Sequence, residues 1–262
     1  MDLKLLNKQG SKLTFLIKDT NPAFVNTLRR IMTSEVPTLA IKNVTFIKNN
    51  SALFDEILAH RLGLLPLLTD LATYVLPDKC VCKEAGCARC QVMLSLKAEG
   101  PLTVYASDLK FQDPKVKPVY PKMPIIKLLK GQELEFEAVA TLGLGKEHVK
   151  YNSCHAYYKG YPKITIDKVK NVEEVVKSCP VNVYESKGKQ LNIINLEACT
   201  LCMACVDICD PKDSVKVESS EKDFIFTIES WGKLPAEEIL ARALDVLDER
   251  LDEFSTLLNK AK

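Results

Sequence analysis

The stretch LPAEEILARALDVLDERLDEFSTLLNK at residues 234–260 is the most informative part of the sequence for the fold. Pro235 and the two glutamates after it are typical of the first turn of a helix, where a missing N–H does no harm and negative charge complements the helix dipole. Large apolar side chains then recur at steps of four and three residues, which is the spacing of an apolar seam along a helix. The seam consists of Leu240, Leu244, Leu247, Leu251, Phe254 and Leu258.

A seam of this length needs a surface that covers it. One alternative is that the predicted helix packs on a sheet of its own domain, and part of it must do so. The seam continues almost to residue 262, however, which favours a partner helix from another subunit for the rest. We therefore expect one helix to serve both the fold of the chain and an interface.

Strands and a further helix are predicted at the two ends of the chain. Residues 222–232 alternate large apolar and polar side chains, which predicts a strand with one buried face. Residues 1–20 predict a hairpin for the same reason. Residues 21–36 predict a helix, because Pro22 suits its first position and Pro37 stops it.

The middle of the chain has a different character. Residues 39–49 predict a strand, and residues 51–67 predict a helix that ends near Gly63 and Pro66. Residues 71–165 include five prolines between positions 101 and 124 that would break any long helix, so we expect an inserted, mostly antiparallel β domain there. These prolines are Pro101, Pro114, Pro118, Pro121 and Pro124.

Composition limits the possible functions. The chain has 262 residues, and its net charge of +2, from 36 basic and 34 acidic residues, creates no long-range field that would draw it to nucleic acid. The sequence shows neither a signal-peptide pattern nor a run of about eighteen apolar residues, so we expect a soluble, cytoplasmic protein. Eight of the ten cysteines fall in two short groups, which in such a chain predicts metal binding rather than a disulfide framework.

The first group lies in EACTLCMACVDICDPKDS at residues 197–214, where four cysteines have the spacing C-x2-C-x2-C-x3-C of bacterial ferredoxins. In such a run three thiolates hold one cluster and the fourth serves the other cluster of two-cluster proteins. A Cys-Pro pair upstream supplies the missing ligand, so we predict one [4Fe–4S] cluster, open to loss of one iron, on Cys179, Cys199, Cys202 and Cys205. Cys209 is left over, and we expect it to be free or disulfide-bonded.

The second group, KCVCKEAGCARC, places Cys80, Cys82, Cys87 and Cys90 close enough to close a tetrahedral zinc site. Structural zinc sites of this kind contribute directly to folding. The alternative is a pair of disulfides pinning a surface loop, as intracellular proteins of hyperthermophiles allow. The ligand count and spacing favour zinc.

Catalytic signatures are missing from the sequence. It contains no P-loop, G-x-G-x-x-G, G-x-S-x-G or H-E-x-x-H motif, and no acidic triad that would hold the magnesium ions of nucleotide polymerisation. Cys154 and His155 are adjacent in a predicted strand and so point to opposite faces. We therefore expect no catalytic residues. The main alternative function is a ferredoxin-like electron-transfer or oxidoreductase subunit, which one cluster without a flavin or nicotinamide motif disfavours.

Three stretches carry a resemblance to a known family. NPAFVNTLRRIMTSEVPTLAI (21–41), LGLGKEHVKYNSCHAYYKGYPKI (142–164) and FTIESWGKLPAEEILARALDVLDERL (226–251) resemble the α-type assembly subunits of multisubunit DNA-directed RNA polymerases. The ferredoxin-like iron–sulfur insert resembles that of the archaeal branch of this family, and the resemblance covers essentially the whole chain. The chain departs from the fullest pattern, because residues 164–178 lack the three cysteines that would hold a second cluster.

The resemblance implies an α+β fold in three parts. Residues 1–40 and 220–262 would form a split dimerisation domain of antiparallel sheet and helices. Residues 41–164 would form the inserted β-rich domain, whose four-cysteine loop at 80–90 stands where eukaryotic relatives bind zinc. Residues 165–219 would form the ferredoxin-like iron–sulfur domain.

The resemblance also implies partners. The chain would pair with the smaller subunit L and, with subunits N and P, form the platform for the large catalytic subunits, meeting DNA only through the complex. It would be a scaffold without catalytic residues of its own. The residues expected at the heterodimer interface are Phe24, Leu28, Ile31, Leu244, Leu247, Leu251 and Phe254.

Overall fold

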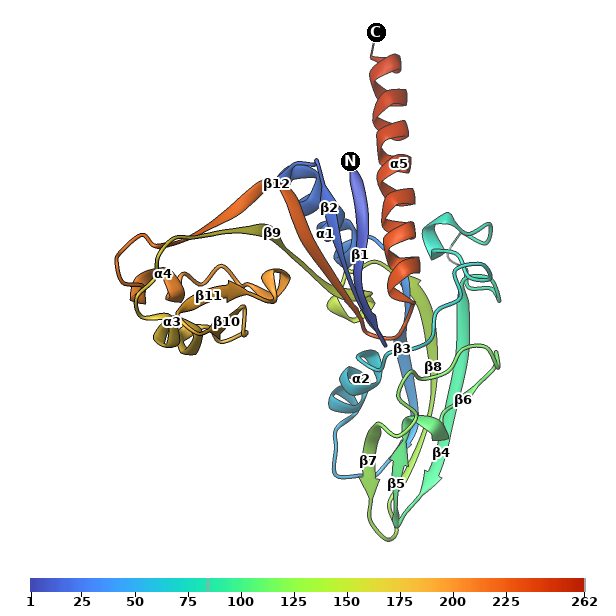
Figure 1. Cartoon of the computed structure of the whole chain (residues 1–262). Coiled ribbons are helices and arrows are strands. Elements are labelled where there is room, and N and C mark those ends of the chain that lie inside the picture. The colour runs from blue at the N-terminus through green and yellow to red at the C-terminus, as the bar shows by residue number, and fades with distance from the viewer. Residues whose placement is uncertain (84, 262) are drawn as a thin grey trace. The chain divides into compact units, whose positions relative to one another are not determined.

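The computed structural model describes residues 1–83 and 85–261 and shows a mixed α and β chain (Figure 1). The five helices in this described part are α1 (Pro22–Ser34), α2 (Asp55–Gly63), α3 (Val172–Ser178), α4 (Ala204–Ile208) and α5 (Ala236–Lys260). The strands are β1 (Asp2–Gln9), β2 (Lys12–Lys18), β3 (Thr38–Asn49), β4 (Gln91–Glu99), β5 (Leu102–Tyr105), β6 (Lys110–Phe111), β7 (Pro124–Leu128), β8 (Glu133–Gly143), β9 (Cys154–Ile166), β10 (Tyr184–Lys187), β11 (Gln190–Ile193) and β12 (Val215–Ser230).

The chain divides into two compact units. The first consists of residues 1–9, 13–27 and 157–227, and the second of residues 10–12, 28–156 and 228–262. Two sheets have four strands each, in the orders β1-β2-β12-β9 and β3-β8-β4-β6, and two have two strands each, β10-β11 and β5-β7. The three-part division expected from the sequence remains a prediction.

Aromatic packing organises the sheet of the first unit. Phe15 of β2 and Phe226 of β12 stack with their ring centroids 5.3 Å apart, and Tyr158 of β9 lies 6.1 Å from Phe226. Such pairs add about 1 kcal/mol beyond their buried area. The hairpin predicted at residues 1–20 forms as β1 and β2, but only β2 is largely buried.

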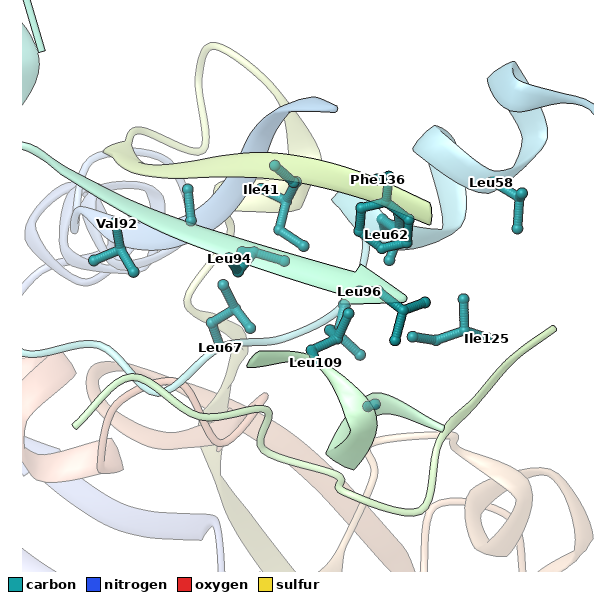
Figure 2. Packing of buried hydrophobic residues seen from close by; sticks show 14 of the residues in the cluster. Ile41, Leu58, Leu62, Leu67, Val92, Leu94, Leu96, Leu109, Ile125 and Phe136 are labelled. Carbon is teal, nitrogen blue, oxygen red and sulfur yellow. The ribbon is translucent and has the colours of Figure 1, made fainter. Parts of the chain in front are cut away.

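The second unit has its core between the β3-β8-β4-β6 sheet and α2. The three longest strands pair antiparallel, with Phe46 opposite Phe136 and Leu94 opposite Ala138. Apolar side chains from the strands and from the loop segments that follow them meet on one face (Figure 2). Leu58 and Leu62 add the inner face of α2, and both are buried. The mostly antiparallel strand pairing expected for the proline-rich middle is confirmed.

Helix α5 behaves differently along its length. Its first half packs into the second unit through Ala236, Ile239 and Ala243, which are buried. Every residue from Asp248 to Lys260 is exposed, and in Figure 1 these turns project beyond the other elements of their unit. The chain itself therefore covers only half of the helix.

Lys233, in the turn that leads into α5, is buried although it is a lysine. Its ammonium donates to the carbonyl of Lys150 and lies 3.4 Å from the hydroxyl of Thr38. Burial lowers the pKa of this amine to about 8. A buried amine is tolerated when its donors find acceptors, and these contacts tie the start of α5 to the beginning of β3.

Two predicted elements differ from the observed ones in length. The helix expected over residues 51–67 covers only Asp55–Gly63. It ends before Pro66, where the chain turns its apolar side chains into the core. The strand expected over residues 222–232 starts earlier, at Val215, because β12 continues beside β9 beyond the part that carries the stacked aromatic rings. In the described part of the chain, no helix has the length and apolar character needed to cross a membrane.

Candidate metal centres and exposed helix

The four cysteines of the 80–90 loop converge on one point. Their Sγ atoms all lie within 4.8 Å of one another, with Cys80 3.4 Å from Cys82 and 3.6 Å from Cys87. Cys90 lies 3.5 Å from Cys82 and 3.8 Å from Cys87. These four thiols could hold one metal ion.

Local turns bring these thiols together. The amide of Lys83 donates to the carbonyl of Cys80 at 3.0 Å, and the amide of Cys90 donates to that of Cys87 at 3.0 Å. Lys83 and Gly86 both have positive φ angles, of 49° and 86°. Glycine suits position 86 because other residues rarely adopt this backbone conformation. The loop is thus shaped by its backbone as well as by its cysteines.

The spacing of the sulfurs distinguishes the two chemistries considered for this loop. A tetrahedral ion with metal–sulfur bonds of about 2.3 Å separates its sulfurs by about 3.8 Å, whereas a disulfide requires about 2.05 Å. The observed contacts of 3.4 to 3.8 Å match the first arrangement, and all four thiols are free. The neighbouring thiol of Cys80 lowers the pKa of the Cys82 thiol to about 7, which favours the thiolate that a metal needs.

The cysteines predicted to bind an iron–sulfur cluster surround one small cavity in the first unit. Cys179 reaches it from the end of α3, Cys199 and Cys202 from the loop before α4, and Cys205 from α4 itself. The other lining residues are mostly apolar: Val181, Val183, Tyr184, Thr200, Met203 and Val217. All four of these cysteines thus line the same cavity, and their binding of a cluster stays a prediction.

The sulfurs of this cavity receive hydrogen bonds. The amide of Val183 donates to Sγ of Cys179 at 3.4 Å, and the hydroxyl of Tyr184 donates to Sγ of Cys205 at 3.3 Å. Such bonds are among the features by which proteins stabilise cluster thiolates. Leu201 and Met203 have positive φ angles of 58° and 63°. Residues that alternate in this way turn backbone N–H groups inward, as anion-binding and iron–sulfur loops do.

The core around this cavity is thin. Of its ten described buried residues three are cysteines, and the rest are mostly valines. Burial raises the pKa of the Cys205 thiol, while hydrogen bonds from the amide of Ala204 and the hydroxyl of Thr200 lower the pKa of Cys202. Small domains with so little apolar area commonly depend on a metal for stability.

Lys159 of β9 is a neighbour of this loop that the sequence analysis missed. Its ammonium donates to the carbonyl oxygens of Glu197 at 2.7 Å and Cys199 at 2.6 Å. Lys159 thus fixes the backbone of Cys199, the first cysteine of the run. No signal in the local sequence connects residues 40 positions apart, so only the fold reveals this contact.

The remaining cysteines stand apart. Cys209 is buried, is not among the residues lining the cavity, and its thiol donates to the carbonyl of Val206 at 3.2 Å. Its thiol is free, which is one of the two states expected for it from the sequence. Cys154 is fully buried, and burial raises the pKa of its thiol to about 11, so it has neither the access nor the ionisation of a nucleophile.

Helix α5 presents its seam to solvent. Leu251 and Phe254 are 58% and 65% exposed, so the chain leaves more than half of each side chain uncovered, and Leu244 is 40% exposed. Leu28 and Ile31, on α1, are instead buried within the chain. An exposed apolar surface of this kind marks an interaction site.

Comparisons with known proteins find relatives along almost the whole chain. Residues 41–169 match the model of the RNA polymerase Rpb3/RpoA insert domain. The chain is 42% identical to DNA-directed RNA polymerase subunit Rpo3 of Methanosphaera stadtmanae over 269 residues, which cover 99% of each protein. It is 38% identical to the Rpo3 subunit of Pyrococcus furiosus, over 99% of this chain and 98% of the relative, and 34% identical to that of Archaeoglobus fulgidus, again over 99% and 98%.

The fold and these matches define an α-type subunit of a multisubunit RNA polymerase, with the insert domain of that class. Such subunits work only in complex with others, so partner subunits are implied. The chain belongs to the archaeal family of RNA polymerase subunit Rpo3. The polymerase function expected from the sequence is confirmed over the electron-transfer alternative.

Proposed function

We propose that this chain is the assembly scaffold of an archaeal RNA polymerase in the cytoplasm, and that it pairs with subunit L through α5. The exposed seam on α5 is the observation that carries the proposal: large apolar side chains stand in water on a helix that the chain covers only at its start. The pair, with subunits N and P, would form the platform for the large catalytic subunits.

The dimer surface proposed here is centred on α5. Leu244, Leu247, Leu251 and Phe254 supply the apolar face, and Leu28 and Ile31 stabilise the fold from inside the chain. Phe24, half-buried on α1, is the remaining candidate. Mixing the purified chain with subunit L should give a 1:1 complex by size-exclusion chromatography with light scattering. Two separate monomer peaks would refute the proposed pairing.

We further propose that the four-cysteine loop holds a structural zinc ion. The sulfur spacing supports this. An ion pair at 3.6 Å between Lys79, next to the loop, and Glu249 places the loop beside α5. A zinc ion here would order the loop that lies beside the proposed dimer helix, while taking no part in any reaction.

Removal of this zinc is expected to destabilise the second unit. At a free zinc concentration about 1,000 times the dissociation constant, the bound ion adds about 4 kcal/mol of stability. Cys82→Ser should therefore lower the melting temperature by about 10 °C and reduce the zinc content measured by mass spectrometry from one ion per chain to none. Val81→Ser is the matched control, because Val81 is 89% exposed and adjacent in sequence. Purified protein without zinc but with two disulfides would contradict the assignment.

The cavity around Cys179, Cys199, Cys202 and Cys205 is proposed to hold one iron–sulfur cluster with a structural role. Bound there, the cluster would supply cross-links between the end of α3 and the loop before α4, closing a domain whose own core is thin. The apolar lining would shield it from solvent. The missing second run of three cysteines limits this chain to one cluster.

Lys159 is expected to support cluster binding by holding the carbonyls of Glu197 and Cys199. Lys159→Met keeps most of the side-chain volume but leaves both carbonyls without this donor, at a cost of about 1 kcal/mol for each part-buried acceptor. We expect the variant to lose its cluster at least about tenfold faster. The rate is measured as the fall in visible absorbance after dilution in anaerobic buffer. Lys163→Met, at an exposed position further along β9, is the control. Equal rates in the two variants would exclude this role.

A further inference from the structure

The spacing of the cysteine run occurs twice in the first unit. It ends at Cys209, and the same spacing counted back from Cys179 gives three positions further upstream. Each of these positions holds a valine where the run at 199–209 holds a cysteine. We call the three residues the valine triad: Val169, Val172 and Val175.

The two runs also have equivalent places in the fold. Cys179 is the first residue after α3, and Cys209 is the first residue after α4. Both cysteines have extended backbone, with ψ angles of 110° and 142°. In two-cluster ferredoxins the fourth cysteine of each run serves the cluster of the other run. By this exchange Cys179 belongs with the cysteines at 199–205, and Cys209 belongs with the valine triad.

The residues at the triad do not fit a second cluster. Val172, Val175 and Cys209 are 5%, 0% and 4% exposed, and Val169 packs against the same core. Iron–sulfur clusters are held by thiolates, and valine offers no ligand atom. None of these four residues lines the cavity of the proposed cluster. Three apolar side chains and one thiol therefore fill this region as core.

Asn171 joins the start of α3 to the end of α4. It is the residue before α3, where an asparagine side chain usually caps its own helix, but here it makes no such cap. Its side-chain amide instead donates to the carbonyl of Ile208 at 2.7 Å, and its side-chain oxygen accepts from the amide of Asp210 at 2.8 Å. The amide of Lys170 donates to the carbonyl of Asp210 at 2.7 Å. These bonds hold the residues on both sides of Cys209.

We propose that the valine triad and Asn171 link α3 to α4 in place of a second cluster. This inference rests on the proposed function, because it takes the cluster at Cys179 as the other link. The triad fills the region with apolar side chains, and the hydrogen bonds of Asn171 fix the end of α4 against the start of α3. The domain then needs iron at one site only, and Cys209 is a buried thiol without a metal role.

Restoring the three cysteines tests the equivalence of the two runs. The full chain with Val169→Cys, Val172→Cys and Val175→Cys is purified anaerobically from an iron-replete host. We expect its iron and acid-labile sulfide to double, from about four to about eight of each per chain. Adding Cys209→Ala should reduce this gain by at least about one iron, because Cys209 supplies the fourth ligand. A folded triple variant with no gain in iron would overturn the inference.

Hydrogen exchange tests the role of Asn171. In the parent chain, Asn171→Ala should speed amide exchange in α3 and α4 at least about tenfold while the iron content stays unchanged. In the triple variant the same substitution should have less than about a threefold effect, because thiolates then link the two helices. Asn195→Ala is the matched control, since Asn195 also precedes a helical turn of this unit and is exposed. Equal exchange in Asn171→Ala and the control would contradict the proposal.

If the triple variant does not fold, variants of the parent chain decide. Val175→Ala should speed exchange around α3 at least about tenfold with full iron content, because it opens a cavity in a packed core. Loss of iron in Val175→Ala or Asn171→Ala would place these residues at the working cluster and overturn the inference. A parent chain that holds no iron would refute the proposed function. A parent with one cluster and a folded triple variant without a second would refute only this inference.

Discussion

Glutamates in place of Leu251 and Phe254 are expected to abolish the pairing of this chain with subunit L. The two side chains are 58% and 65% exposed, so the substitutions remove little surface that the isolated chain buries. In the complex, they would put two carboxylates into the centre of an apolar interface. Each buried anchor of this kind contributes about 2 kcal/mol or more, so the affinity should fall by at least about 1,000-fold. Isothermal titration of the variant with subunit L measures the loss.

The matched control uses the same helix turns and the same charge. Thr256→Glu with Asn259→Glu also adds two carboxylates to the exposed end of α5, on the side away from the seam. This control should bind subunit L with nearly unchanged affinity, and both variants should keep the melting temperature of the parent. An equal loss of binding in the control would mean that charge on the helix, rather than the seam, decides the pairing.

Cys202→Ser is expected to unfold the cluster domain while leaving the pairing with subunit L intact. Cys202 is exposed, so exchanging its sulfur for oxygen removes no packing, and only loss of a cluster ligand can have a large effect. Because the core around Val172, Val175 and Val217 is thin, amides there should exchange with solvent more than about 100-fold faster in hydrogen-exchange measurements. Later assembly with the large subunits should weaken.

Cys209→Ser provides the comparison for this variant. Cys209 lies in the same run of cysteines but outside the cavity, so its variant should keep the visible absorbance of the cluster. If Cys202→Ser instead lost its binding to subunit L, the cluster domain would belong to the dimer interface. The separate structural role proposed for the cluster would then be wrong.

The sequence predicted the elements whose pattern is local. The apolar steps from Leu240 to Leu258 predicted α5, and its observed bounds agree. The spacing of Cys199, Cys202 and Cys205, with the Cys-Pro pair upstream, predicted which thiols meet around one cavity. In both cases a few residues close in the chain determine the geometry, so the pattern is sufficient.

Other features depend on contacts that no local pattern records. The sequence could not show that α5 is covered only as far as its middle, because this depends on where the second unit ends. It could not show the contact of Lys159 with Cys199, which joins a strand to a distant loop. Convergence of the four thiols in the 80–90 loop depends on positive φ angles at Lys83 and Gly86. The four sulfurs lie close enough together to hold one metal ion, which their spacing in the chain alone does not show.

The central claim is that the chain is a polymerase scaffold whose cluster serves assembly. The most direct test is to tag the chain in its native host, purify it anaerobically under gentle conditions and identify its stoichiometric partners by mass spectrometry. The account predicts the large polymerase subunits together with a small L-like subunit. Recovery of reductases or dehydrogenases in their place would mean that the cluster carries electrons, and would contradict the account.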